Sequence, residues 1–375
     1  MDSQPPDAEV RSAPSVAAPT MKRDWGSIAV GTNRVSLRLV VTVAGTVVWL
    51  GLMLIATGTA GVVSLWNSAL FLAPLILIGS LTRSTSLATI GRLILAGGFM
   101  MGVAYVGASL FRLIVPDINA PIRDFTIPPM EEALKLAPVA WIVFRQRRSG
   151  AWSFGATDLM LLGAAAGTGF GVVETAYAHV RAGWGSHVAM LPVAEISNGH
   201  LDAGHEIWTS IAGGFLGLAL LTNRSRKTAV LVGASGIVWT TLDHIANNYS
   251  AVHPGFFASF LRVITGNGWF SLVFFLAVIA AAIVVDLWAV RTCASDIPEL
   301  AALPSGGDQS LAARWRFRLG RRALAYTIFK GRRATAGRRP EAVEAAVMVL
   351  RRMFYGRMGA AVAPATQPVT EGIQS

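Results

Sequence analysis

Charged residues and cysteine are scarce in this sequence. Charged residues make up 14% of the 375 positions, whereas hydrophobic residues make up 53%. That balance is too apolar for an ordinary soluble domain. The single cysteine, Cys293, excludes an intrachain disulfide, so cysteine content gives no information on the redox compartment. The sequence also has no internal repeat, no Gly-rich phosphate loop and no Cys/His zinc spacing.

The chain has long apolar runs instead. Runs of about 20 apolar residues match the thickness of a bilayer. We therefore predict an all-α fold, a polytopic transmembrane helix bundle of about eight spans. The predicted spans cover residues 36–58, 61–81, 92–115, 127–145, 156–178, 204–222, 228–248 and 267–290.

Basic residues in alternate connectors predict the orientation. Lys22 and Arg23 precede the first span, Arg145 follows the fourth and Arg291 follows the eighth, whereas the intervening connectors carry fewer basic residues. By the positive-inside rule both termini are cytoplasmic, in a multi-pass protein of the cell membrane.

The two ends of the chain differ in character. Residues 1–35 are rich in Pro, Ser and Ala and are predicted to be a disordered cytoplasmic tail. Residues 292–375 form a basic cytoplasmic tail, with helices predicted over 311–330 and 340–358. This tail can either lie on anionic lipid headgroups or remain solvated. Nucleic acid is not a predicted partner, because no recognition motif accompanies the charge.

Four sets of polar residues interrupt the apolar spans, and hydrocarbon cannot solvate such groups. The sets are Glu131, Glu132 and Lys135; Phe170 and Glu174; His205; and His244 with Asn248. At about 1.5 Å per residue they lie roughly 21 to 28 Å from the cytoplasmic side. All four therefore reach one level in the outer leaflet, which predicts a single polar pocket that opens outward.

Local spacing adds detail to the first set. Pro128 and Pro129 suit the first positions of a helix, which places Glu131 and Glu132 in its first turn. Lys135 is within reach of either glutamate, so one ion pair can form and one carboxylate lacks a dedicated partner. Neighbours of the motifs, namely Asp202, Glu206 and Asp243, are predicted to lie at the membrane interface or on other helix faces. His179, His187 and His253 are predicted to be solvated.

Together these residues resemble the PrsW family of intramembrane proteases, which is related to the CAAX prenyl protease (CPBP) group. The matching pattern is Glu-Glu-x-x-Lys at 131–135, Phe-x-x-x-Glu at 170–174, a His at 205, and His-x-x-x-Asn at 244–248. The resemblance covers roughly 122–250, the motif core of a transmembrane protease domain over 36–291. It implies an intramembrane peptidase that cleaves membrane-anchored proteins, such as an anti-sigma factor in a signalling cascade.

Peptide hydrolysis needs an activated water and a stabilised oxyanion. Glu131 or Glu132 is the predicted base, and the other glutamate pairs with Lys135. Glu174 can hold the water or orient a histidine, while His205, His244 and Asn248 can donate hydrogen bonds to the oxyanion. Phe170 is predicted to shape the pocket.

A metal-dependent mechanism is the second choice. No cofactor is predicted, because the helical His-Glu-x-x-His spacing is absent. A bound zinc ion would take Glu132, Glu174, His205 and His244.

Two other functions remain open at this point: a proton- or ion-coupled transporter, which also uses carboxylates and histidines in its spans, and an inactive scaffold with the same pocket. The predicted partners are a membrane-anchored protein substrate and the bilayer itself.

Overall fold

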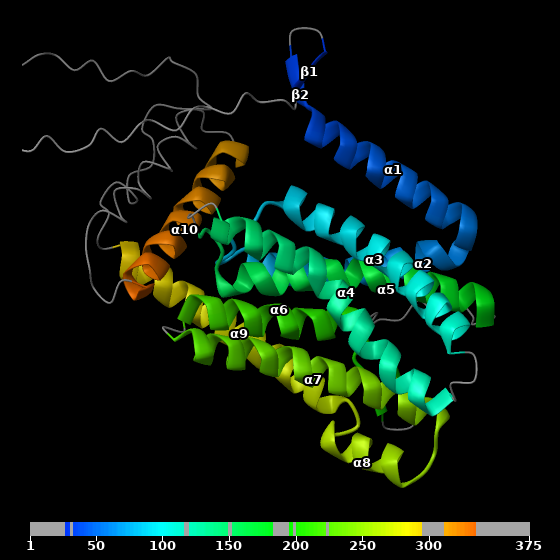
Figure 1. The fold of residues 1–375 in the computed structure, drawn as a ribbon. Coiled ribbons are helices and arrows are strands. Elements are labelled where there is room, and N and C mark those ends of the chain that lie inside the picture. Colours follow the sequence, from blue (N-terminus) through cyan, green and yellow to red (C-terminus); the bar gives the residue numbers. More distant parts are fainter. Residues whose placement is uncertain are drawn as a thin grey trace, which may run out of the picture. The chain divides into compact units, whose positions relative to one another are not determined.

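The computed structural model describes residues 27–30, 33–115, 120–148, 152–182, 195–197, 200–222, 225–294 and 311–334. Ten helices and four short strands form within these ranges (Figure 1). The chain divides into two compact units, Met1–Val48 and Trp49–Ser375.

The first unit contains a β-hairpin that the sequence analysis did not predict. β1 (Ser27–Val30) pairs antiparallel with β2 (Asn33–Ser36), with Ile28 opposite Val35. These strands lie within residues 1–35, for which the sequence predicts a disordered tail, and residues 1–26 lie outside the described part. Helix α1 (Leu37–Thr57) follows directly.

Every predicted span coincides with a helix, although some helix boundaries differ by several residues. The second unit contains α2 (Thr59–Gly79), α3 (Leu87–Ile114), α4 (Ala120–Arg148), α5 (Ala156–Ala182), α6 (Gly204–Thr222), α7 (Arg226–Val252), α8 (Phe256–Ile264), α9 (Trp269–Ala294) and α10 (Leu311–Ala334). A second hairpin pairs β3 (Glu195–Ser197) with β4 (His200–Asp202).

Five stretches of the described chain are long and apolar enough to cross a membrane: Thr59–Gly79, Leu87–Ile114, Ala156–Tyr177, Arg226–Ser250 and Phe256–Cys293. The last stretch includes both α8 and α9. The structure is therefore consistent with an all-α membrane bundle, while the number of eight spans stays a prediction. Helices α4 and α6 are not among these stretches; α4 carries Glu131, Glu132 and Lys135, and α6 carries His205 and Glu206.

Helix α5 is the central element of the second unit. Most of its apolar stretch Ala156–Tyr177 is buried, and it packs against α2, α3, α4, α6 and α9. Small residues allow this close approach. A Cβ atom on Gly163 would collide with the carbonyl oxygen of Thr209 in α6, and one on Gly213 would collide with that of Leu159 in α5. These glycines hold α6, which carries His205, close to the central helix.

Helix α10 packs against the bundle. The Tyr326 hydroxyl donates to the carbonyl of Thr82 at 2.6 Å, and Arg322 donates to the carbonyl of Ser80 at 2.7 Å. Lys330 donates to the carbonyl of Leu220 at 2.6 Å, near the end of α6. Cations suit carbonyl groups at helix C-termini. One face of this tail helix is thus covered by protein. The sequence analysis predicted either lipid headgroups or water around the tail and did not predict this contact with the bundle. The helix predicted over 340–358 lies outside the described residues.

The close contact between α5 and α6 predicts a difference between two glycine substitutions. Gly163→Ala should lower the melting temperature in detergent by several degrees, because the added Cβ must push Thr209 away. A loss of about 1 kcal/mol lowers Tm by roughly 2–4 °C in a chain of about 200 residues. Gly102→Ala is the matched control, since a Cβ there meets nothing within 4 Å. Equal melting temperatures for the two variants would contradict this packing argument.

Candidate active site

Helix α4 supplies the two glutamates and the lysine, but it does not begin where the sequence predicts. It begins at Ala120, so Pro128 and Pro129 lie inside the helix. Glu131 and Glu132 therefore follow about three turns after its start, and the predicted first-turn position is wrong. Each internal proline removes one i→i−4 hydrogen bond, and the helix continues through this local cost.

Lys135 forms its ion pair with Glu132. Both side chains are fully buried, and the Lys135 ammonium donates to Oε1 of Glu132. Nζ of Lys135 also lies 2.7 Å from Nδ1 of His205 on α6. One cation thus joins α4 to α6. The structure resolves the question that the spacing left open: Glu132 is the paired glutamate.

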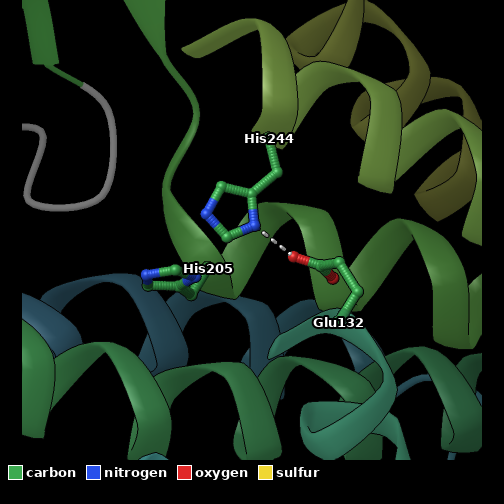
Figure 2. Close-up of side chains that lie close together, drawn as sticks. All are labelled: Glu132, His205 and His244. Atoms are coloured by element: carbon green, nitrogen blue, oxygen red, sulfur yellow. Dashed lines mark hydrogen bonds and ion pairs between the residues drawn. The ribbon is translucent and has the colours of Figure 1, made fainter. Parts of the chain in front are cut away.

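His244 on α7 approaches Glu132 from the other side. Its Nδ1 lies 2.9 Å from Oε1 of Glu132 (Figure 2). Its Nε2 lies 3.3 Å from the amide nitrogen of Asn248. The amide nitrogen of Asn248 can only donate, so Nε2 of His244 accepts and Nδ1 carries the proton that goes to Glu132. Asn248 and Glu132 together hold one orientation of this imidazole.

His205 is held in the same manner by a different pair. Because Nδ1 of His205 faces the donating ammonium of Lys135, its proton lies on Nε2, which pairs with a carboxylate oxygen of Glu174 on α5. The ring of Phe170 meets His205 edge-on, with ring centroids 5.1 Å apart. The rings of His205 and His244 are 5.2 Å apart. The structure thus brings all eight predicted site residues into one cluster.

Besides Oε2 of Glu174, which forms an ion pair with Nε2 of His205, two carboxylate oxygens of the cluster have no hydrogen bond among the described residues. They are Oε2 of Glu131 and Oε2 of Glu132, and both are buried. Oε2 of Glu131 lies 3.5 Å from Nε2 of His244. Buried acceptors of this kind require a partner such as water or a cation. The cluster therefore contains two places where a reactant water or an ion can be bound.

The donor types of the cluster fit a zinc ion. Glu132, His205 and His244 each offer one ligand atom, and the three atoms lie within 4.8 Å of one another. Two imidazoles and a carboxylate are a common catalytic zinc set. Glu174 is not part of this group, although the sequence placed it among the alternative ligands. The ammonium of Lys135 contacts Glu132 and His205, so a metal requires Lys135 to move away from two of the three ligands.

Trp208 and Asp243 are site residues that the sequence analysis missed. The indole of Trp208 stacks on His244 with ring centroids 4.4 Å apart, and its centroid lies 5.6 Å from the Lys135 ammonium. Its Nε1–H donates to Asp243 at 2.8 Å, and Ser271 donates to the same carboxylate at 2.5 Å. Asp243 is 2% exposed, so it is buried inside the bundle on the helix that carries His244. The spacing of Trp208, three residues after His205, was the available signal.

Glu206 is likewise buried, on a different face of α6 from His205. Ser68 on α2 donates to its Oε1 at 2.9 Å. Consecutive helical residues point about 100° apart, so Glu206 faces α2 while His205 faces the cluster. The prediction of another helix face is consistent with this contact.

Comparisons with known proteins give one match. A search of curated proteins and a search of solved structures each found none. A family model described as PrsW family intramembrane metalloprotease matches residues 85–284, more than half of the chain. The matched range includes all of the cluster, from Glu131 on α4 to Ser271 on α9. The chain belongs to the PrsW family of intramembrane metalloproteases.

Proposed function

We propose that this peptidase cleaves membrane-anchored protein substrates with a water molecule activated by Glu131, near the extracytoplasmic face of the membrane. The observation that carries the assignment is the different pairing of the two adjacent glutamates. Oε1 of Glu132 accepts hydrogen bonds from Lys135 and His244, whereas Glu131 accepts none from either and only approaches Nε2 of His244 at 3.5 Å; Oε2 of each glutamate is buried without a hydrogen bond among the described residues. A general base needs an oxygen that is free to accept the proton of a water.

In this mechanism Glu131 takes a proton from the water as the water oxygen attacks the scissile carbonyl carbon. Glu131 then returns the proton to the leaving amine. The Lys135 ammonium supplies positive charge where the oxyanion develops, and a fixed charge in a buried site is effective there. Glu132 and Glu174 hold Lys135 and His205 in place, and Asn248 holds His244. Phe170 and Trp208 close the cluster on its apolar sides.

A metal is the alternative that the family description raises. Glu132, His205 and His244 are the residues that would hold it. A zinc ion at such a site polarises a carbonyl and makes a bound water more acidic. The position of Lys135 favours the metal-free route, because its ammonium already neutralises this donor set.

The substrate class is part of the proposal. The apolar stretches place the cluster in a membrane protein, and the resemblance to the family points to single-span signalling proteins such as an anti-sigma factor. A transporter or an inactive scaffold is less well supported, since the family model describes a protease.

The two glutamates should respond differently to substitution by glutamine. Glu131→Gln should lower cleavage of a co-expressed single-span reporter by at least about 100-fold, the usual contribution of a general base, with an unchanged melting temperature. Glu132→Gln should lower both cleavage and stability, because Lys135 is left as an uncompensated buried charge at a cost of about 3–5 kcal/mol. Immunoblots of reporter fragments and thermal unfolding in detergent measure the two effects. Normal cleavage by Glu131→Gln would overturn its assignment as the base, and normal cleavage by both variants would overturn the site.

Chelation tests the metal-free route. Purified protein should keep its cleavage rate after treatment with a zinc chelator and dialysis. Elemental analysis should find no zinc bound by the residues of the cluster. The comparison protein is His244→Ala, whose metal content should equal that of the wild type. Loss of activity on chelation that added zinc restores, together with a lower zinc content in His244→Ala, would show that the trio holds a metal.

The orientation of the chain can be measured by cysteine labelling. In a Cys293→Ser background, Asp202→Cys should react with an impermeant thiol reagent added outside intact cells, because the cluster end is predicted to face outward. Leu311→Cys on α10 is the matched control at a site that is 71% exposed, and it should react only after the membrane is permeabilised. Labelling of Asp202→Cys from the cytoplasmic side alone would reverse the proposed topology.

A further inference from the structure

We propose that strand β3 is a docking edge for the substrate: an extended segment of the membrane-anchored substrate pairs with the backbone of Ile196 on its way to the cluster. This inference rests on the proposed peptidase function and deepens it, because it names how the substrate backbone is held.

The hairpin leads directly into the cluster. β4 ends at Asp202, and Oδ1 of Asp202 accepts the backbone N–H of Gly204 at 3.1 Å. Gly204 has a φ of 65°, a turn conformation that glycine adopts without strain, and His205 is the next residue. The strand and the histidine are therefore joined by a short capped turn, so a peptide bound along the hairpin lies near the helix start that carries His205.

The inner edge of the hairpin is already occupied. The backbone N–H of Leu201 in β4 donates to the carbonyl of Asn267 at 2.8 Å. The carbonyl oxygen of Leu201 faces Gly268, where a Cβ atom would collide with it. Both backbone groups of Leu201 thus point away from β3, toward the turn between α8 and α9. Leu201 itself is 2% exposed, which fixes β4 to the body of the protein.

The register then determines what β3 presents on its other side. Ile196 lies opposite Leu201 in the antiparallel pair. Directly opposed residues in such a pair either exchange both hydrogen bonds or direct both outward. Because Leu201 directs its groups outward, Ile196 does so too, and its N–H and C=O face the open edge of β3. Outside the β3–β4 pair itself, no backbone hydrogen bond among the described residues reaches either group of Ile196.

The chemistry of the substrate explains why such an edge is useful. A peptide bond inside a membrane helix has its N–H and C=O bonded within the helix, and it must be unwound before water can attack it. In an apolar setting the unwound groups need new partners. A strand edge offers one donor and one acceptor to the unwound backbone, the mode of recognition known as β-augmentation. With three residues, β3 can hold only a short extended segment.

A proline at Ile196 tests the edge. Ile196→Pro removes the outward N–H and keeps the pairing with β4, because that N–H does not face β4. We expect a rise of at least tenfold in the KM for a single-span substrate, with an unchanged melting temperature. Ile196→Ala retains the N–H and should cleave like the wild type. Equal KM values for the two variants would overturn the docking edge. Cleavage by the wild type would still support the peptidase function in that case. Absence of cleavage by the wild type would overturn both.

A binding measurement separates docking from a folding defect. The experiment uses the full chain with three substitutions: Glu131→Gln, Cys293→Ser and Ile196→Cys. This protein is oxidised together with each member of a series of substrates, and each substrate carries a single cysteine at a different position. An extended partner should form disulfides at every second substrate position, the period of a strand. Disulfides at every third or fourth position, or at none, would show that the substrate does not dock on β3 as a strand.

Discussion

The buried ammonium of Lys135 is the constraint on which the site depends. An unpaired cation inside an apolar bundle is strongly unfavourable, so the fold must bring compensating groups to it. Glu132 provides the opposite charge from the same helix, and His205 provides an acceptor from α6. Glu132 in turn accepts from His244 on α7. Three helices are thus held at one point by a single charged group and its partners.

The apolar scaffold makes this convergence possible. Gly163 on α5 and Gly213 on α6 let the two backbones meet with no intervening side chain. The same central helix carries Phe170 and Glu174, which contact His205. A largely buried helix with small residues at its contacts therefore sets the distance between the carboxylate and the imidazole. Packing and catalytic geometry are determined by the same close approach.

The two adjacent glutamates show how environment separates roles. They have the same chemistry and differ by one position on a helix, yet Glu132 is bound on two sides and Oε2 of Glu131 has no hydrogen bond among the described residues. Trp208, which is held by Asp243, forms an apolar wall against His244 and the Lys135 ammonium. In the proposed mechanism this arrangement reserves one carboxylate for the water and the other for the lysine.

Much of the site could be predicted from spacing alone. Helical periodicity places Lys135 beside a glutamate and Asn248 beside His244, and the depth count places the four polar sets at one level. These features are local or depend only on helix rise, so the sequence determines them. Apolar run length likewise predicts the helices, because membrane thickness requires it.

Only the tertiary structure decided which glutamate pairs with Lys135. Both glutamates lie within helical reach of the lysine, and the choice depends on His205 and His244, which belong to other helices. Sequence analysis also did not predict three other features: the start of α4, the burial of Asp243 and the packing of α10. Each of them depends on contacts between distant segments. A side chain's neighbours within a helix follow from the period of that helix, whereas its neighbours across helices follow from how the whole chain packs.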